Sequence, residues 1–224
     1  MNKKILIYCL SLFILMSCAG LLTGYDARKS FEQGMALFNQ GKYSDALPYF
    51  EKALELEPEF TQAYIYLGRT HLNLRQWTQA IQPLRTAYRL SPGETRREAL
   101  NFLLDALIGG ALAELKQGNY SSSIGYLREA LEVDPASGKA KSELVSTLLA
   151  YGGALLSEGN YSGAIKQFTE AVQLSPGNFD AYRGLVKSFV KNGDYLSAIK
   201  TVNDAMKIAP TDQDRSLLQD MLRP

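Results

Sequence analysis

GKYSDALPYFEKALELEP, residues 41–58, decides the fold, because the block returns four more times along this chain of 224 residues. The copies keep its internal spacing: RQWTQAIQPLRTAYRLSP (75–92), GNYSSSIGYLREALEVDP (118–135), GNYSGAIKQFTEAVQLSP (159–176) and GDYLSAIKTVNDAMKIAP (193–210). A unit of this size cannot bury its apolar face alone, so successive units must pack on one another. The repeat therefore predicts a long surface for partners rather than a single chemical pocket.

Within the block, apolar residues follow the period of an α-helix. They recur at steps of three and four residues after the turn at 41–43: Ala46, Leu47, Phe50, Ala53 and Leu54. Ser44 stands where an N-cap is expected, and Pro58 ends the helix because proline has no N–H to donate. A second amphipathic stretch precedes each block, as at 31–38, so each unit is predicted to be a hairpin of two helices and the chain all-α.

The hairpin resembles the tetratricopeptide repeat, whose period is about 34 residues. The family's small, aromatic and proline positions fall in the first unit on Gly34, Tyr43, Ala46, Phe50, Ala53 and Pro58. The resemblance implies a right-handed superhelical solenoid of five hairpins closed by a C-terminal capping helix. Three residues depart from the pattern: Ser123 replaces an alanine, Arg75 replaces a turn glycine, and Val186 takes the small position of the last hairpin.

The expected domain boundaries follow from these motifs. They are a signal peptide at 1–17, a lipidated N-terminus and tether at 18–26, a repeat domain at 27–212 and a capping helix at 213–224. The repeats are expected at 27–60, 61–94, 104–137, 145–178 and 179–212. Thr211 is the expected N-cap of the capping helix, with Leu217, Leu218 and Met221 covering the end of the last hairpin.

The spacing between blocks is unequal. The block-ending prolines lie at 58, 92, 135, 176 and 210, which gives steps of 34, 43, 41 and 34 residues. Because the blocks are equal in length, the extra nine and seven residues precede the first helices of repeats three and four. The added residues contain no proline, since the next proline after Pro92 is Pro135 and the next after Pro135 is Pro176. We therefore predict that they belong to the first helices of repeats three and four. These helices would begin at about 95 and 138 and be longer by roughly two turns. A short separate helix or loop is the alternative.

The first twenty residues carry a second signal. Lys3 and Lys4 precede an apolar run at 5–16 that ends in LMSC at 15–18, which resembles a bacterial lipoprotein signal peptide. The resemblance implies cleavage before Cys18 and lipidation of Cys18 by several acyl chains, enough for stable membrane anchoring. Ala19 follows the lipidated cysteine where aspartate could stand, and this resembles lipoproteins that are sorted to the outer membrane. The expected location is therefore the periplasmic face of the outer membrane. An uncleaved inner-membrane anchor is the alternative, since 5–22 is long enough to span a bilayer.

Charge and cysteine content narrow the partners. The chain has 24 Lys and Arg against 23 Asp and Glu; loss of Lys3 and Lys4 with the signal peptide leaves 22 against 23, a net charge near −1. Nucleic acid is therefore not an expected partner. Cys9 leaves with the signal peptide and Cys18 is lipidated, so no disulfide is expected.

No motif for catalysis stands out. His71, the single histidine, falls inside a predicted first helix and is interpreted as a packing residue. The glycine pairs at 109–110 and 152–153 lie in helical patterns and lack the strand that a dinucleotide-binding loop requires. We expect no enzyme activity, cofactor, metal or small-molecule substrate.

In the family that the chain resembles, the first helices line a concave groove for a protein or peptide partner. The corresponding positions are mostly apolar in repeats one to four and basic in repeat five: Phe31, Met35, Ile65, Arg69, Ile108, Leu112, Leu149, Arg183, Lys187 and Lys191. The last three recur at four-residue steps and predict a basic stripe on one helix face. The hypothesis is a partner segment with apolar side chains along the groove and an acidic group at the stripe; an ordinary solvated face is the alternative.

Three functions fit these observations. The leading one is a membrane-tethered periplasmic adaptor that binds envelope proteins and supports complex assembly. The second is a pilotin-like role, because lipoproteins of this build resemble the factors that carry secretin subunits of type IV pili and secretion systems to the outer membrane. The third is a docking regulator of peptidoglycan enzymes.

Overall fold

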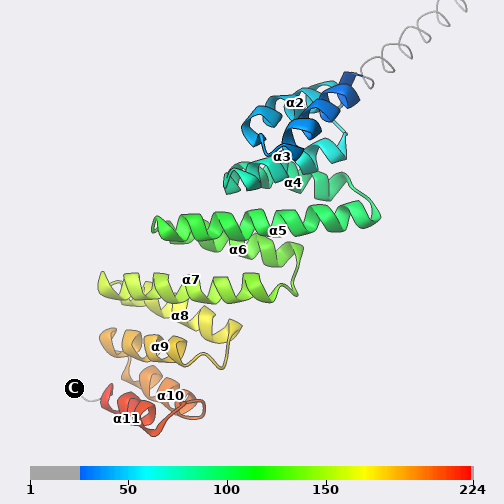
Figure 1. The fold of residues 1–224 in the computed structure, drawn as a ribbon. Coiled ribbons are helices and arrows are strands. Elements are labelled where there is room, and N and C mark those ends of the chain that lie inside the picture. The colour runs from blue at the N-terminus through cyan, green and yellow to red at the C-terminus, as the bar shows by residue number, and fades with distance from the viewer. Residues whose placement is uncertain (1–25, 223–224) are drawn as a thin grey trace, which may run out of the picture. The chain divides into compact units, whose positions relative to one another are not determined.

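The computed structural model describes residues 26–222, whose regular structure is entirely helical. A first helix occupies residues 26–39 of this range, and ten more follow (Figure 1): α2 Tyr43–Leu56, α3 Thr61–Asn73, α4 Trp77–Leu90, α5 Gly93–Lys116, α6 Tyr120–Val133, α7 Gly138–Ser157, α8 Tyr161–Leu174, α9 Phe179–Lys191, α10 Tyr195–Met206 and α11 Asp212–Asp220. No strand occurs within 26–222, so the predicted all-α class is confirmed. Helices that are consecutive in the chain pack together, as α3 does on α4 and α7 on α8.

The helices group into two compact units, which divide between Gly109 and Gly110. The division falls within α5, so that helix contributes to both. Residues 1–25, including the expected signal peptide and Cys18, lie outside the described residues. Among those described, no helix is long and apolar enough to cross a membrane.

Hairpin turns reverse the chain at residues with positive φ. Glycine takes this position in four of the five turns, with φ of 73° at Gly41, 80° at Gly118 and Gly159, and 79° at Gly193. The second turn has Arg75 instead, at φ 56°. A Cβ makes this left-handed conformation unfavourable by about 1 kcal/mol or more, so the sequence departure at Arg75 is a strained position in the structure.

The first unit packs around aromatic rings. Phe50 is fully buried, and a Cβ added at Gly34 would lie 2.8 Å from its Cε1. Its ring centroid is 5.8 Å from those of Phe31 and Tyr66, and Phe31 also contacts Phe60 at 4.9 Å. Glycine in the first helix is therefore required by the phenylalanine opposite it.

The second unit uses the same device around Phe168. Added Cβ atoms at Gly152 and Gly184 would lie 2.8 and 2.4 Å from this ring, so one phenylalanine of α8 fills space against both α7 and α9. Phe168 joins a cluster of buried residues with Leu155, Ala164 and Leu185. Close helix packing therefore accounts for Gly152.

The added residues before repeats three and four belong to single helices. α5 has 24 residues and α7 has 20, against 13 in α3 and in α9. The alternative of a separate short helix or loop is therefore not found. At 1.5 Å per residue, the seven residues by which α7 exceeds α9 extend it by about 10 Å.

The helix ends correct one prediction and confirm another. Ser44 is not the N-cap of α2, which begins at Tyr43 with Lys42 as its N-cap and no side-chain cap bond. Thr211 does cap α11, since its Oγ1 accepts a hydrogen bond of 3.1 Å from the Asp214 backbone N–H. The predicted N-cap, Ser44, lies two residues after the observed one, a difference within the usual variation of helix boundaries.

The predicted cover at the end of the last hairpin is only partly present. Leu218 is fully buried against Val202 of α10, and Met221 packs beside them. Leu217 does not share this role, because its side chain is 41% exposed. α11 therefore presents a single buried stripe rather than the broader face expected.

Candidate functional site

Two of the predicted groove residues of the first unit, Ile65 and Ile108, are buried in its core. Ile65 is 2% and Ile108 3% exposed; Ile65 packs in the core with Ala87 and Ala99. These two side chains stabilise the packing of successive helices and offer little surface to a partner. Phe31 and Met35 are half-buried around the Phe50 cluster and remain partly accessible.

Arg69 is held by a set of aromatic rings from three helices of the first unit. Its guanidinium carbon lies 4.7 Å from the ring centroid of Tyr66, 4.9 Å from that of Phe102 and 5.2 Å from that of Phe38. Glu98 lies 3.8 Å from its Nη1. Cation–π contacts of this kind stabilise the charged group where it is. Arg69 therefore stabilises the packing of this unit, and its contacts within the unit leave it less free to bind a partner.

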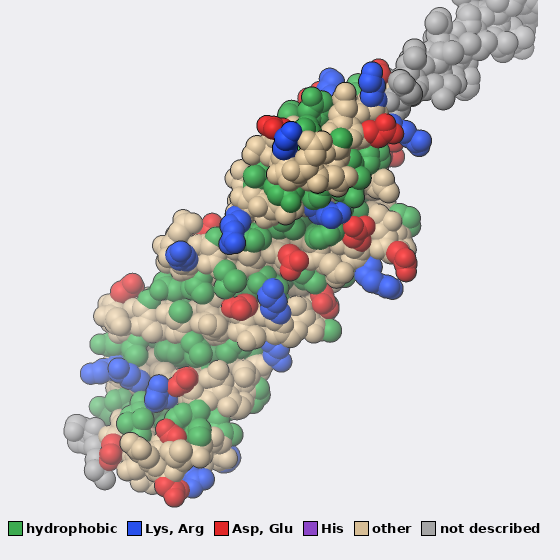
Figure 2. All heavy atoms as spheres, in the orientation of Figure 1, with side chains coloured by type: hydrophobic (Ala, Val, Ile, Leu, Met, Phe, Trp, Pro, Cys, Tyr) green, Lys and Arg blue, Asp and Glu red, His purple; other side chains and the backbone are tan. Residues whose placement is uncertain are grey.

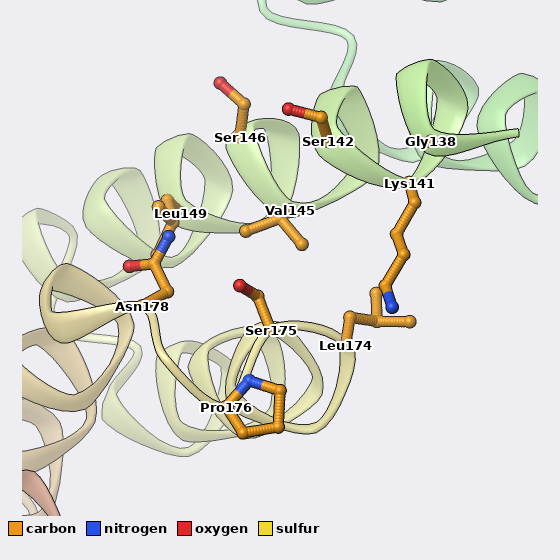
Figure 3. Close-up of a pocket in the computed structure, with 10 residues that line it drawn as sticks. All are labelled: Gly138, Lys141, Ser142, Val145, Ser146, Leu149, Leu174, Ser175, Pro176 and Asn178. Carbon is orange, nitrogen blue, oxygen red and sulfur yellow. The ribbon is translucent and has the colours of Figure 1, made fainter. Parts of the chain in front are cut away.

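In the second unit, an open hollow of about 620 Å³ lies between α7 and the segment that joins α8 to α9 (Figure 3). Lys141, Val145 and Leu149 are among the α7 residues that line it, and Leu174 and Pro176 are among those on the opposite side. Figure 3 shows Lys141 and Val145 extending toward that segment, and Ser175 pointing back toward α7. We call this hollow the α7 cleft.

The α7 cleft depends on the lengthening of α7. Its lining from Gly138 to Ser142 belongs to the turns that a 13-residue first helix lacks. Leu149 is the predicted groove residue of repeat four, and Ser142 and Ser146 precede it at helical spacing on the same face. The added turns therefore continue the predicted groove face of α7 beyond its ordinary length.

The lining of the α7 cleft combines three kinds of contact. Leu149 and Leu174 are half-buried and offer apolar surface, whereas Val145 is only 6% exposed. Ser142 and Ser146 are exposed, and Figure 3 shows their hydroxyls pointing away from the segment that joins α8 to α9. Lys141 is exposed and adds a positive charge. Asn178 is fixed at the rim because its Oδ1 accepts a 2.9 Å hydrogen bond from the Ala181 backbone N–H as the cap of α9. An extended peptide with apolar side chains and a free backbone fits such a lining.

The basic stripe predicted on α9 is partly neutralised. Arg183 forms an ion pair of 2.8 Å with Asp180 on its own helix. It also lines a second hollow with residues of α11, among them Asp214 and Asp220. Lys187 and Lys191 are exposed on α9. The structure thus supports a two-lysine stripe, with Arg183 engaged by acidic neighbours.

The groups with shifted pKa values, Asp194, Asp204 and Lys207, lie on α10 or at its two ends. Hydrogen bonds from the side chain and the backbone N–H of Ser197 lower the pKa of Asp194. A hydrogen bond from Lys207, at 2.7 Å, lowers the pKa of Asp204 and raises that of the lysine. These are caps and surface ion pairs, so the shifts report local structure and not an acid–base pair.

Within residues 26–222, no group of three His, Cys, Asp or Glu side chains could hold a metal ion. The Nδ1 of His71 lies 2.7 Å from Oε1 of Gln76 in a half-buried contact, which fits its predicted packing role. On the face drawn in Figure 2, Lys and Arg side chains are interspersed with Asp and Glu side chains.

Sequence reasoning missed most of the α7 cleft. Only Leu149 was among the predicted groove residues, because the groove was placed at positions of an ordinary first helix. The signal that could have found Lys141 and Ser142 was the seven-residue surplus before repeat four. Sequence reasoning also gave no role to the departure at Ser123, whose buried Oγ lies 3.5 Å from Oγ1 of the buried Thr147.

Comparison with known proteins identifies the repeat. Family models described as "Tetratricopeptide repeat" match residues 31–95 and 155–222, together more than half of the chain. The chain belongs to the tetratricopeptide-repeat family, and such a fold is a scaffold for protein–protein interaction.

The individual relatives share the repeat and little more. Tetratricopeptide repeat protein 16 of Macaca fascicularis is 27% identical over 132 residues, which are 58% of this chain and 15% of that protein. Protein O-mannosyl-transferase Tmtc3 of Drosophila melanogaster is 39% identical over 59 residues, 26% of this chain and 6% of that protein. The chain thus spans less than a fifth of the length of these relatives.

A solved structure supports the fold. A TPR repeats protein from Bacteroides fragilis NCTC 9343 superposes with a TM-score of 0.66 at 16% identity, covering 88% of this chain and 97% of that one. At this identity the likeness concerns the fold alone.

Proposed function

We propose that this chain is a membrane-tethered periplasmic adaptor whose α7 cleft binds an extended segment of an envelope protein. The observation that carries the proposal is the lengthened α7, which adds about two turns of lining to a face that already includes a predicted groove position. Binding, rather than catalysis, is the proposed activity.

The chemistry of the cleft sets the partner segment. The half-buried side chains of Leu149 and Leu174 favour one or two apolar side chains. The exposed hydroxyls of Ser142 and Ser146 can hydrogen-bond to a peptide backbone that is not already paired in secondary structure. Lys141 favours a carboxylate at the end of the segment next to the start of α7.

The membrane tether rests on the sequence LMSC at 15–18. Lipidation of Cys18 would place the repeats close to a bilayer, because an eight-residue tether spans at most about 30 Å. The expected site is the periplasmic face of the outer membrane, with protein or peptide partners and no nucleic acid.

The binding claim is tested with the mature protein immobilised and exposed to a chemically crosslinked envelope extract. We expect Ser142→Arg combined with Ser146→Arg to reduce capture of the partner at least tenfold, since both side chains line the α7 cleft and are exposed. Ser121→Arg is the matched control, because Ser121 is an exposed serine on α6 that does not line the cleft. Equal capture by all three proteins would remove the cleft from the proposal.

The tether is tested separately by metabolic labelling with palmitate and by membrane fractionation. Wild-type protein is expected to incorporate label and to sediment with the outer membrane, and Cys18→Ala to lose both properties. If the wild-type protein incorporates no palmitate and sediments with the inner membrane, the uncleaved anchor would be supported instead.

Deletion of the gene narrows the adaptor role. Loss of secretin multimers with normal cell shape would favour the pilotin-like function. Altered shape with intact secretin would favour regulation of peptidoglycan enzymes, and neither effect would leave the general adaptor.

A further inference from the structure

The two ends of the α7 cleft differ in chemistry. Figure 3 shows Lys141 extending toward Leu174 at one end and Leu149 pointing toward Asn178 at the other. All four residues line the cleft. Leu149 and Leu174 are half-buried, whereas Lys141 is exposed. The cleft therefore presents a charged group and an apolar side chain at separate points along its length.

Lys141 has no carboxylate within reach on its own helix. Lys52 and Lys207 each pair with a carboxylate three residues away, at 3.0 and 2.7 Å. The residues three and four positions away from Lys141 are serine, glycine, leucine and valine, so no such pair can form there. Among the described residues that line the cleft, none is Asp or Glu. The ammonium group is therefore available to a carboxylate of a bound segment.

The polar groups between the two ends carry no charge. The hydroxyl of Ser175, which is half-buried, points back toward α7 (Figure 3). Oδ1 of Asn178 already accepts the 2.9 Å bond from the Ala181 backbone N–H, so its amide nitrogen is the group left to donate. Both side chains can donate hydrogen bonds to the backbone carbonyls of a bound segment. Charge is therefore selected only at the Lys141 end.

The distance between the two ends sets a spacing within the ligand. Leu149 follows Lys141 by eight residues of one helix, which is about 12 Å along the axis of α7 at 1.5 Å per residue. A fully extended chain advances about 3.3–3.6 Å per residue. An extended segment therefore needs about three or four residues to pass from one end to the other.

We infer that the α7 cleft selects a short linear motif, in which an apolar residue and an Asp or Glu lie about three or four positions apart in an extended segment. The apolar side chain packs on Leu149, and the carboxylate pairs with Lys141. This inference rests on the proposed binding function of the cleft and adds the sequence that the partner must carry. It also excludes a class of partner, because Lys141 repels a segment with Lys or Arg at the acidic position.

The test begins with a random peptide library displayed on phage and selected on the immobilised mature protein. Peptides of about ten residues can hold the motif in either chain direction. The binding site of each enriched peptide is then located by NMR amide shifts. We expect shifts within 138–149 and 174–178, the segments that contain the lining residues. The enriched peptides should share an acidic residue at the stated distance from an apolar one.

Charge reversal tests the role of the lysine directly. Lys141→Glu should bind the selected peptides with roughly tenfold lower affinity, since like charges repel. Replacing the acidic residue of the peptide with lysine should restore binding to this variant. Lys139→Glu is the matched control, because Lys139 is exposed on the first turn of α7 but does not line the cleft. The control should keep the acidic preference, and neither substitution should change the melting temperature, since both lysines are exposed.

The outcomes separate this inference from the proposed function. Peptides that bind the cleft without an acidic residue at this spacing would overturn the inference and leave the binding function intact. Equal affinity of the selected peptides for wild type and Lys141→Glu would have the same meaning. If no enriched peptide maps to the cleft, the proposed function of the cleft fails, and the inference fails with it.

Discussion

Aromatic rings pack between the helices of residues 26–109, whereas the helices from α7 to α11 begin with polar side-chain caps. In the first unit, Phe31 alone contacts three other rings, and the N-caps of α2, α3 and α4 make no side-chain hydrogen bond. In the second unit, side-chain caps begin all helices from α7 to α11: Ser137, Asn160, Asn178, Asp194 and Thr211.

Proline and glycine follow the same division. Pro48 lies inside α2 and Pro83 inside α4, where each removes a helical hydrogen bond. No proline lies inside α6 to α11, whose turns all have glycine at positive φ where a hairpin reverses. One repeat pattern is thus stabilised mainly by packing in one unit and more by local backbone chemistry in the other.

The largest expected effect on stability comes from the aromatic core of the first unit. Phe50→Ala should lower the free energy of unfolding by about 3–5 kcal/mol, because it removes a fully buried ring and leaves a cavity. Hydrogen exchange should show the greatest loss of protection within residues 26–109. Phe168→Ala is the matched variant for the other unit, and a loss below about 1 kcal/mol for Phe50→Ala would contradict the aromatic core.

Two adjacent glycines of α7 separate packing from helix propensity. Gly152→Ala should cost about 1–3 kcal/mol, because the new Cβ would lie 2.8 Å from the Phe168 ring. Gly153→Ala should instead stabilise by about 1 kcal/mol, since its Cβ meets nothing within 4 Å and alanine favours the helix. Chemical denaturation measures both, and the same sign for the two variants would refute the packing role of Gly152.

Substitutions at the positive-φ position of two hairpin turns should change stability by smaller amounts and in opposite directions. Arg75→Gly should stabilise the first unit by about 1 kcal/mol, because glycine adopts φ 56° without steric strain. Gly118→Ala, at φ 80° in the second unit, should destabilise by a similar amount. Thermal melts of both variants check the pair; a stabilised Gly118→Ala would show that these turns do not require glycine.

Caps can be exchanged between the units. Lys42 (φ −84°, ψ 62°) and Asn160 (φ −83°, ψ 72°) have nearly the same backbone conformation. Asn119 shares it (φ −81°, ψ 62°) but makes no cap bond, and its Nδ2 donates to Glu114 instead; Leu37 stands at the position of Glu114 before Lys42. Lys42→Asn should therefore gain, and Asn160→Ala lose, about 1 kcal/mol in urea denaturation, since Asn160 Oδ1 accepts a 3.0 Å bond from Gly163 N–H. Unchanged stability in Lys42→Asn would contradict this prediction and would mean that the new side chain, like that of Asn119, makes no cap bond.

The smallest effect is a pH dependence confined to one cap. The pKa of Asp194 in the folded state lies below its ordinary value of 3.8. Its carboxylate therefore contributes stability above that value, and the contribution is lost as the pH falls through the lower folded pKa. The melting temperature of Asp194→Asn, compared with wild type during acid titration, should lose this dependence, as the Asn160 and Asn178 caps already lack it. Parallel pH profiles for the two proteins would argue against the shift.

The sequence was sufficient for the repeat and the long helices, because period and proline position are local properties. It was not sufficient for the groove. A first helix packs against second helices on two sides, so the accessible stripe is narrower than its spacing suggests, and Ile65 and Ile108 fall into the core. Two of the rings around Arg69 belong to Phe38 and Phe102, each more than 30 residues away from it in the sequence. No local sequence pattern predicts contacts over such a separation.

Binding of a partner segment in the α7 cleft is the step on which the proposed function depends. It is tested most directly by a photoreactive amino acid incorporated at Ser142 in intact cells, with the same residue at Ser121 as the control. We expect a discrete adduct from Ser142 that disappears when Leu149→Arg is added, and no such adduct from Ser121. No adduct from Ser142, or the same adduct from both positions, would contradict it.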